Sequence, residues 1–435
     1  MTLATAWATE ALSQASSAAK AMITGRVERV VGLRFDVAGL SASIGEEVLV
    51  EGSQLRGEVV AVENGYVTCM PLGETTGLSG GSRVYATGRL ASVPVGWDLR
   101  GRVLNGLGDP LDGRGEWRGE RASLSGDGVP HPLDRQRITE PLPLGVRAWD
   151  ATATLGRGQR VGVFAGSGVG KSTVLGMVAR NTAADVNVVA LIGERGREVR
   201  EFIESDLGPE GLQRSVLVVA TSDQPALVRI RATFVATRIA EWFRDQGADV
   251  LLMMDSLTRC CMAQREVGLS AGEPPATRGY PPSVFALLPR LLERAGAGKT
   301  GSITGIYTVL VDGDDHNEPI SDAARSILDG HITLTRALAH ANHYPAIDVL
   351  SSVSRVMSQV TSPEQRAGAG KLRQLLAAYR EAKDLVEIGA YQRGSNPLVD
   401  EALEKRDAID AFLQQDTHEP AAFDDTWQAL MNVVG

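Results

Sequence analysis

A glycine-rich run at residues 165–173 contains the residue types that bind phosphate. The run reads Ala165, Gly166, Ser167, Gly168, Val169, Gly170, Lys171, Ser172 and Thr173. Glycines let backbone N–H groups point at an anion, and a helix that starts at the end of the run adds its partial positive charge. Lys171 is then placed to reach the outer phosphates and Ser172 to bind Mg²⁺. The run therefore predicts a loop that binds ATP, in which Ala165 replaces the first glycine of the strict pattern with another small residue.

Two carboxylates follow apolar segments that have the character of buried strands. Asp255 ends the segment that begins at Val250, and Glu194 stands just after the segment 186–192. Ligands bind at the carboxyl ends of strands in an open α/β sheet, so both side chains are expected beside the phosphate loop. Asp255 is then expected to be the carboxylate on the Mg²⁺ side of the site. Glu194 is suited to orient and deprotonate a water molecule, but a carboxylate that only favours the helix dipole is an equal alternative.

Arg355 is a lone arginine within the segment 351–356. Phosphoryl transfer develops negative charge that an inserted arginine can stabilise, but an arginine in this setting can equally pair with a neighbouring acid. The local sequence leaves both alternatives open. The acidic segment 312–318 lacks the ligand spacing of an EF-hand and is interpreted as a solvated loop.

Three kinds of segment must position these residues. Short strands separated by turn residues cover 22–95 and predict a small β-barrel or sandwich, and proline-rich and glycine-rich segments over 96–150 predict ordered connecting loops. Apolar strands alternate with helices over 155–350, which indicates a mainly parallel α/β sheet, and helices are expected at 372–388 and 397–414. The expected organisation is a partner-docking segment at 1–20, a β-barrel at 21–95, a P-loop domain with its leading connection at 96–360 and a helical domain at 361–435.

Composition narrows the class of protein. The chain has 435 residues and a net charge of −9, which argues against a protein whose main task is to hold nucleic acid or an anionic membrane. Its three cysteines, Cys69, Cys260 and Cys261, lack C-x-x-C spacing and predict neither a disulfide framework nor a zinc site. The N-terminus lacks the pattern of a secretory signal, and no apolar run reaches about 18 residues, so we expect a cytoplasmic protein.

Several long motifs, in the same order along the chain, resemble the type III secretion ATPase family. They lie at residues 165–173, 191–202, 253–259, 262–296, 326–332 and 343–357. The likeness runs from about residue 22 to about residue 415 and is strongest to the flagellar protein-export ATPase branch. The injectisome ATPases are near neighbours, and the catalytic subunit of the rotary ATP synthase is a more distant relative. The resemblance implies a Mg²⁺-dependent ATP hydrolase with a RecA-like P-loop domain between a β-barrel and a helical domain.

The resemblance also implies roles for individual residues. Glu194 matches the general base, which favours that alternative over a helix-start carboxylate, and Arg195 matches a neighbouring active-site arginine. Lys171, Ser172 and Asp255 match the groups that hold the phosphates and Mg²⁺. Tyr344 matches the position where the family stacks an aromatic ring on adenine. Arg355 matches the arginine finger that enters the next subunit's site.

A shared site implies a homohexameric ring at the cytoplasmic face of an export apparatus. The implied partners are a stator or regulator protein that contacts the N-terminal segment, an export gate and chaperone–substrate complexes, and no nucleic acid. The loop at 279–282 is expected to face the central pore of the ring. Cys260 and Cys261 depart from the family pattern, and the N-terminal segment is nearly devoid of basic residues, so any association with the membrane is expected to pass through the apparatus.

Three rival functions remain for a chain with these motifs. A subunit of a proton-coupled rotary ATP synthase shares the core motifs, but the segments 272–285 and 389–403 resemble the export family instead. A hexameric nucleic-acid translocase shares the fold, but the N-terminal domain lacks the dense basic and aromatic stripe that binds single strands. A catalytically inactive ring subunit is disfavoured because both Lys171 and Glu194 are present.

Overall fold

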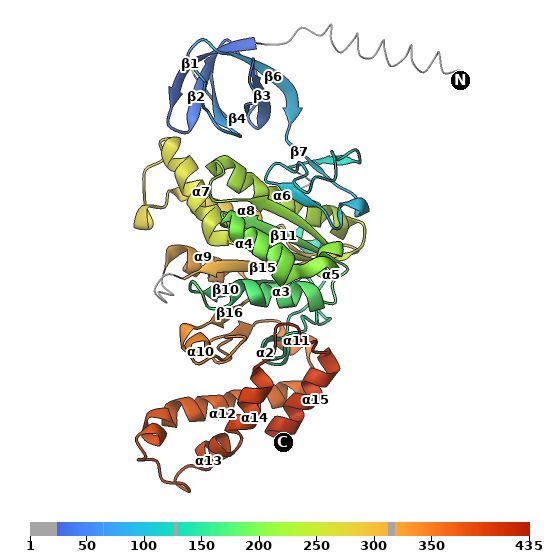
Figure 1. Cartoon of the computed structure of the whole chain (residues 1–435), viewed down its shortest axis with the longest axis vertical. Coiled ribbons are helices and arrows are strands. Elements are labelled where there is room, and N and C mark those ends of the chain that lie inside the picture. The colour runs from blue at the N-terminus through green and yellow to red at the C-terminus, as the bar shows by residue number, and fades with distance from the viewer. Residues whose placement is uncertain (1–23, 64, 126–128, 312–317) are drawn as a thin grey trace, which may run out of the picture. The chain divides into compact units, whose positions relative to one another are not determined.

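The computed structural model describes residues 24–63, 65–125, 129–311 and 318–435. The docking segment expected at 1–20 and nearly all of the acidic segment 312–318 lie outside these residues. The chain divides into two compact units, of which the first ends at Ala91 and the second runs from Ser92 to Gly435 (Figure 1). The predicted domain boundaries at 20, 95 and 360 stay predictions. No helix within the described ranges combines the length and the apolar character needed to cross a membrane.

The first unit is a closed antiparallel barrel in the order β1-β2-β5-β4-β3-β6. Its strands are β1 (Thr24–Val31), β2 (Arg34–Ala38), β3 (Glu46–Val50), β4 (Arg56–Glu63), β5 (Tyr66–Pro71) and β6 (Arg83–Leu90). Alternate side chains such as Phe35, Val48 and Val59 point inward and are fully buried. Gly57 is a glycine because a Cβ atom there would lie 2.8 Å from the ring of Phe35. The barrel is as predicted, although β2, which contains a buried aspartate, was not expected from the sequence.

The second unit contains a mainly parallel sheet in the order β17-β16-β10-β15-β13-β11-β12-β8. Its strands are β8 (Val103–Asn105), β10 (Arg160–Ala165), β11 (Val186–Ile192), β12 (Ser215–Ala220), β13 (Asp249–Asp255), β15 (Ser302–Leu310), β16 (Gly330–Leu334) and β17 (Val353–Ser354). β17 and the short β14 (Gly296–Ala297) pair antiparallel to their neighbours. The central strands are mostly apolar and almost entirely buried because helices cover both faces. The segment expected to be only connecting loops contributes β8 to one edge of this sheet.

Helices pack on the two faces of the sheet (Figure 1). One face carries α2 (Arg147–Thr152) and α3 (Lys171–Asn181), and the other carries α6 (Ala226–Asp245), α7 (Leu257–Ser270), α8 (Pro282–Leu292) and α9 (Pro319–Ile327). Shorter elements of this unit are β7 (Ser92–Pro94), β9 (Arg121–Ser123), α4 (Gly196–Glu201), a π-helix (Phe202–Leu207), α5 (Gly208–Gln213), α10 (Arg336–His340) and α11 (Met357–Val360). Three 3₁₀ turns span Trp97–Leu99, Pro132–Asp134 and Thr277–Gly279.

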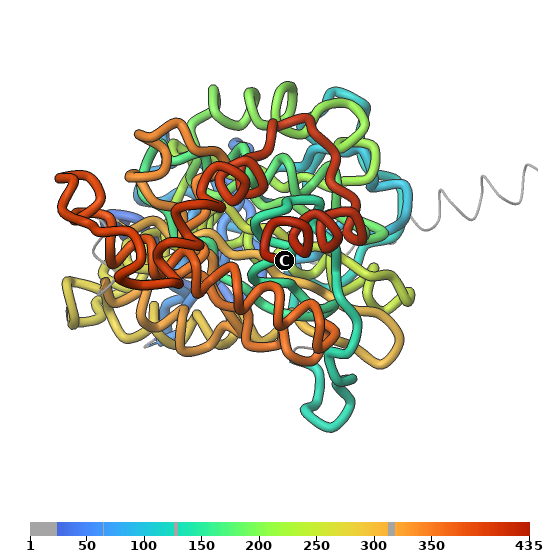
Figure 2. Tube along the Cα trace, turned by 90° about the horizontal axis from the view of Figure 1, so that it is seen from below, coloured from blue at the N-terminus to red at the C-terminus, as the bar shows by residue number. Residues whose placement is uncertain are grey.

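Four helices form the C-terminal part of the second unit: α12 (Pro363–Glu387), α13 (Pro397–Glu404), α14 (Arg406–Leu413) and α15 (Phe423–Val434). Figure 2, which views the chain from below, shows them in orange and red in front of the rest of the trace. α12 starts well before the predicted residue 372 because Ser362 and Gln365 form a reciprocal capping box at its N-terminus. The single helix expected at 397–414 is two helices that meet at Lys405. Buried residues of α12, α14 and α15 share one hydrophobic core with α2 and α3.

Candidate active site

The glycine-rich run forms the turn between strand β10 and helix α3. Gly168 and Gly170 have φ of +79° and +87°, a left-handed conformation that favours glycine. A Cβ atom on Gly166 would lie 3.1 Å from the guanidinium of Arg336, a tight contact that the arginine side chain would have to shift to relieve. Ala165 is the last residue of β10 and is buried, so its methyl group belongs to the core rather than to the turn. The predicted strand–turn–helix context of a phosphate loop is therefore present, and α3 begins at Lys171.

Lys171 lies between the two carboxylates that the sequence predicted beside the loop. Its Nζ atom forms an ion pair with Asp255 and lies 3.7 Å from Oε1 of Glu194. The three side chains are only 12%, 14% and 4% exposed for Lys171, Glu194 and Asp255. β10, β11 and β13 are parallel strands of one sheet, so their carboxyl ends bring the three groups to the same edge. Lys171 is the cation that links the two buried carboxylates.

Asp255 is the last residue of β13 and is fixed by a neighbouring strand. Oγ1 of Thr308 on β15 donates a hydrogen bond of 2.6 Å to Oδ1 of Asp255. The ion pair with Lys171 uses the same Oδ1 atom, so among the described residues no group engages Oδ2. The described residues contain no cluster of three or more His, Cys, Asp or Glu side chains that could hold a metal ion by itself. A carboxylate and the hydroxyl of Ser172 fit Mg²⁺ that arrives with nucleotide phosphates, because this ion is usually held by one or two carboxylates and phosphate oxygens.

Glu194 stands in the turn that follows β11. Gly193 enters this turn with φ of +70°, and the backbone of Glu194 is tied to the next strand, since its carbonyl accepts a hydrogen bond of 3.0 Å from the N–H of Ser222. Burial raises the pKa of Glu194 to about 7, with a further rise from the charge of Asp255 and an opposing effect from Lys171. A hydrogen bond with Glu194 lowers the pKa of Glu198. A carboxylate that titrates near neutrality is suited to accept a proton from water.

A cavity of about 510 Å³ opens in front of these groups. The phosphate loop lines it together with Glu194, Arg195, Glu198 and Arg259. The side chain of Arg195 is 75% exposed and its Nη1 atom lies 3.8 Å from Oε1 of Glu198. Arg259 lies in the first turn of α7, and its Nε atom is buried without a hydrogen-bond partner among the described residues. The sequence reasoning did not single out Glu198 or Arg259, although each lies in the first turn of the helix that follows a predicted site carboxylate, which is a signal for both.

Tyr344 lies beside the phosphate loop, in a second hollow of about 360 Å³. A Cβ atom added to Gly170 would be 3.5 Å from a ring carbon of Tyr344, and 42% of the tyrosine is exposed. Thr173 and Met177 of α3 line the hollow, and so do Gln415, Asp416 and Thr417 from the C-terminal region. Gln415 also holds Tyr344 in place, because its N–H donates a 3.0 Å hydrogen bond to the tyrosine carbonyl. The contribution of residues 415–417 was not apparent from the sequence.

Arg355 does not lie in the cavity of its own chain. It follows the edge strand β17 and is exposed, and its Nη2 atom donates a 3.3 Å hydrogen bond to the carbonyl of Arg325. Its backbone N–H donates a 3.0 Å hydrogen bond to the carbonyl of Asp329, which precedes β16. No carboxylate within the described residues forms an ion pair with Arg355. The alternative in which Arg355 pairs with a neighbouring acid therefore has no support among the described residues.

Three stretches of the chain match known protein families. Residues 21–88 match the β-barrel domain and residues 145–354 the nucleotide-binding domain of the ATP synthase alpha/beta family. Residues 361–432 match the C-terminal domain of the type III secretion ATPase EscN. The first two family models are named for the ATP synthase alpha/beta family, and the third for a type III secretion ATPase.

Relatives match over nearly the whole chain. The chain is 52% identical over 416 residues to the flagellum-specific ATP synthase of Bacillus subtilis, which covers 94% of this chain and 95% of the relative. It is also 52% identical over 413 residues to the type 3 secretion system ATPase of Xanthomonas euvesicatoria, with 94% and 93% covered. The structure of the assembled ATPase EscN from enteropathogenic E. coli aligns with a TM-score of 0.90 at 46% identity, over 94% of this chain and 100% of that chain.

These matches confirm the predicted fold and the predicted kind of enzyme. The barrel, the mainly parallel nucleotide-binding sheet and the C-terminal helices correspond to the three matched domains. The roles predicted for single residues are not tested by the matches and stay predictions. With half of its residues identical to such enzymes over almost its full length, the chain belongs to the family of flagellum-specific and type III secretion ATPases, and it is an ATP hydrolase.

Proposed function

We propose that the chain hydrolyses ATP with Mg²⁺ in the cavity in front of Lys171. The observation that carries the proposal is the position of the Lys171 amine between Asp255 and Glu194, at the mouth of a phosphate loop. The backbone N–H groups of Gly166 to Gly170 and the start of α3 would bind the β-phosphate, and Lys171 would turn from Asp255 towards the outer phosphates. The ring of Tyr344 would stack on adenine from the adjoining hollow.

Mg²⁺ would be held on the protein side by the hydroxyl of Ser172 and the carboxylate of Asp255. The ion would neutralise charge that develops on the phosphate oxygens. Because Thr308 holds Oδ1 of Asp255, the orientation of this carboxylate is set before the nucleotide arrives. Thr308 would therefore act on the position of Mg²⁺ through Asp255.

Glu194 would act as the general base that orients the attacking water and accepts its proton. Its buried position and its pKa of about 7 support this role, because the carboxylate can be ionised and still basic at neutral pH. Arg195 and Arg259, which line the same cavity, would supply positive charge next to the outer phosphates. The buried Nε of Arg259 would gain a partner when an anionic oxygen enters the cavity.

The site would be completed by Arg355 of a neighbouring subunit in a homohexameric ring. Exposure of Arg355 at a sheet edge, with no acidic partner among the described residues, supports its use outside its own chain. The relative EscN has been described as an assembled ATPase, and also in complex with its central stalk EscO. We propose a comparable ring for this chain, with a regulatory stator or stalk protein as partner.

We assign the ring to flagellar protein export, at the cytoplasmic face of the export apparatus. ATP hydrolysis would release substrates from their chaperones, unfold them and deliver them to the export gate. The high identity to the flagellum-specific ATPase of Bacillus subtilis supports this use. The equal identity to a type 3 secretion system ATPase keeps an injectisome as the second candidate. Deletion of the gene separates the two, because loss of filament assembly supports the flagellar use and loss of effector secretion alone supports the injectisome.

A mixed-ring experiment tests the catalytic proposal. Glu194→Gln and Arg355→Ala rings should each bind ATP with Mg²⁺ and lose turnover by about 100-fold or more. Mixing the two variants should restore activity, because some interfaces then combine an intact Glu194 with an intact Arg355. Mixed rings that stay inactive would argue against a site shared between subunits.

A further inference from the structure

We infer that Gln159 is a positioning residue for Arg355 and thereby serves the active site of the neighbouring subunit. The inference deepens the proposed function and depends on it, since it takes Arg355 to act on nucleotide bound to another chain. Gln159 immediately precedes β10, the strand that leads into the phosphate loop of its own chain. The same strand would therefore carry one subunit's phosphate loop and hold the arginine given to the next.

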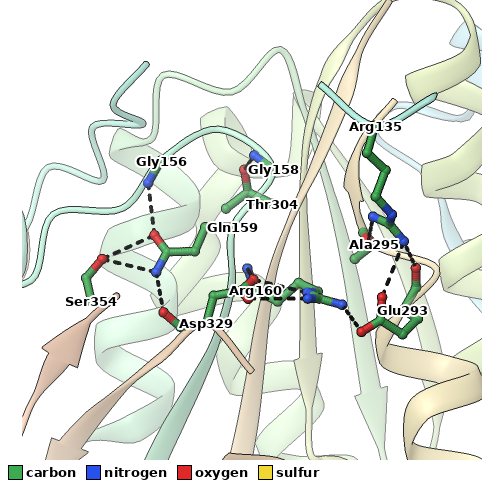
Figure 3. Close-up of polar contacts among 10 residues, drawn as sticks. All are labelled: Arg135, Gly156, Gly158, Gln159, Arg160, Glu293, Ala295, Thr304, Asp329 and Ser354. Carbon is green, nitrogen blue, oxygen red and sulfur yellow. Dashed lines mark hydrogen bonds and ion pairs between the residues drawn. The ribbon is translucent and has the colours of Figure 1, made fainter. Parts of the chain in front are cut away.

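The amide of Gln159 is fully buried and forms hydrogen bonds on both of its polar atoms (Figure 3). Its Nε2 donates to the carbonyl of Asp329 at 3.0 Å and contacts Oγ of Ser354 at 3.1 Å. Its Oε1 accepts from the N–H of Gly156 at 3.0 Å and from Oγ of Ser354 at 3.3 Å. The side chain thus joins the start of β10 to the residue directly before Arg355.

Gln159 and Arg355 also share one acceptor. The carbonyl oxygen of Asp329 accepts a 3.0 Å hydrogen bond from Nε2 of Gln159 and a 3.0 Å hydrogen bond from the backbone N–H of Arg355. Loss of the glutamine amide would remove one hydrogen bond to the carbonyl of Asp329 and the hydrogen bonds to Oγ of Ser354. The backbone that leads into the Arg355 Cα atom would lose restraint, and the direction of its side chain depends on that backbone.

β17 is too short to hold Arg355 by strand pairing alone. It comprises only Val353 and Ser354 and pairs with β16 at the edge of the sheet. A two-residue pairing supplies few ladder hydrogen bonds, and edge positions lack a partner on their outer side. The buried amide of Gln159 therefore adds polar restraint at Ser354, next to the hydrogen bonds that hold Ser352 from Thr333 and Arg373.

Hydrogen bonds and ion pairs fix the start of β10, so the backbone of Gln159 is well positioned. The carboxylate of Asp329 accepts hydrogen bonds from the backbone N–H of Arg160 at 3.1 Å and from its Nε at 3.1 Å. Nη1 of Arg160 forms an ion pair of 2.6 Å with Glu293, and Arg135 donates to the carbonyls of Glu293 and Ala295 (Figure 3). These contacts link β10, the approach to β16 and the end of α8.

The decisive variant is Gln159→Met, which keeps the length of the side chain and removes its hydrogen bonds. Rings of this variant should bind ATP with an affinity within about 2-fold of the parent and lose kcat by about 10- to 100-fold, as expected for a misplaced catalytic group. Mixing with Glu194→Gln subunits should restore turnover, because those subunits provide a well-placed Arg355 to the intact Glu194 of the variant. Mixing with Arg355→Ala subunits should restore nothing, because neither chain then provides a working arginine.

A role confined to the chain's own phosphate loop predicts the opposite pattern. Gln159→Met would then be restored by Arg355→Ala, whose sites are intact and would receive the arginine of the variant, and not by Glu194→Gln. That pattern, or an unchanged kcat in pure Gln159→Met rings, overturns the positioning role alone. If the reference mixture of Glu194→Gln with Arg355→Ala shows no restoration, the shared site fails and the inference fails with it.

Two further variants keep the test decisive if Gln159→Met does not fold. Ser354→Ala removes only the contact between the amide and the residue before Arg355, and it should show the same complementation pattern with a loss of about 3- to 10-fold in kcat.

Asn187→Leu is the matched control, because Asn187 is also a buried amide near the start of a parallel strand. Its Nδ2 atom donates a 2.8 Å hydrogen bond to the carbonyl of Ala179. This substitution should lower Tm while kcat stays within about 3-fold of the parent. A defect of equal size in Asn187→Leu would show that loss of any buried amide accounts for the effect, and would overturn the positioning role.

Discussion

The amine of Lys171 forms an ion pair with the carboxylate of Asp255 across the end of the central sheet. Oε1 of Glu194 lies 3.7 Å from the same amine, so Lys171 interacts with two carboxylates that are mostly buried. A nucleotide phosphate that attracts Lys171 would remove this interaction, and Mg²⁺ would replace it at Asp255. The balance of charge in this cluster underlies three of the predictions below.

Lys171→Met should abolish tight nucleotide binding. The substitution removes the cation that reaches the phosphates, and it leaves Asp255 and Glu194 without this partner. Loss of one partner of a buried charge pair typically costs about 2–5 kcal/mol of binding free energy. Titration with a fluorescent ATP analogue should show at least about a 30-fold increase in Kd. Lys383→Met is the control, because Lys383 is exposed and its Nζ atom lies 3.7 Å from Oε1 of Glu387 on the same helix. Binding that survives in Lys171→Met would show that the loop backbone alone holds the phosphates.

Turnover should depend on pH with a midpoint near 7. Burial raises the pKa of Glu194 to about 7, and a general base is active only when it is ionised. The rate therefore rises with pH through this midpoint, and kcat/KM at pH 6 should be roughly a tenth of its plateau value above pH 8. A profile measured at saturating Mg²⁺ that stays flat down to pH 5.5 would contradict the assignment of Glu194 as the base.

Glu194→Gln should raise the Tm of the nucleotide-free protein at pH 8. Because the folded-state pKa is raised from 4.5 to about 7, ionisation of Glu194 costs folding stability, and this cost grows as pH rises from about 4.5 and is fully present above 7. Glutamine removes the charge and hence the cost. Scanning calorimetry should find a higher Tm for the variant at pH 8 and little difference near pH 5. An equal or lower Tm at pH 8 would mean that Lys171 outweighs the effect of burial.

Tyr344 should contribute to nucleotide affinity through its ring and not through its hydroxyl. The ring lies beside Gly170 in a hollow next to the phosphate loop. Stacking of a base on an aromatic side chain contributes about 1–3 kcal/mol, so Tyr344→Ala should weaken ATP binding by roughly 5- to 150-fold. Tyr344→Phe keeps the ring and should bind within about 2-fold of the parent in the same titration. A similar loss in both variants would assign the effect to the hydroxyl group instead.

Two glycines in helices should respond to alanine with opposite signs. A Cβ atom on Gly176 of α3 would lie 2.7 Å from the backbone oxygen of Asp206, so Gly176→Ala forces α3 and the π-helix apart and should destabilise the protein by about 1–3 kcal/mol. A Cβ atom on Gly370 of α12 would meet no atom within 4 Å. Gly370→Ala should therefore stabilise by up to about 1 kcal/mol, because alanine favours the helix. Urea denaturation of both variants measures the difference, and equal signs would contradict the close packing at Gly176.

The strands that lead to the predicted site residues could be predicted from the sequence, because a run of apolar residues is a local signal. Apolar runs predicted β11 and β12 with the bounds that the structure has, and the turn at 165–171 is required by its own glycines. Less apolar strands escaped prediction. β2 contains Asp36, whose charge is compensated by Arg29 from the neighbouring strand, and β16 is short and begins with Gly330 and His331. Their identity as strands depends on pairing with partners that are distant in sequence.

The sequence by itself predicted which residues bear the chemistry, namely the phosphate loop, Asp255 and, through the family resemblance, Glu194, because residue type and expected strand ends are properties of a short segment. Only the tertiary structure decided how these groups act on one another. The order of strands in the sheet brings Lys171 between two carboxylates, and burial there raises the pKa of Glu194. The same order places β17 at an edge, where Arg355 is exposed and tied to Gln159 through Asp329. Distances between charges, and the water excluded from around them, arise from packing of segments far apart in the chain, and no local pattern encodes them.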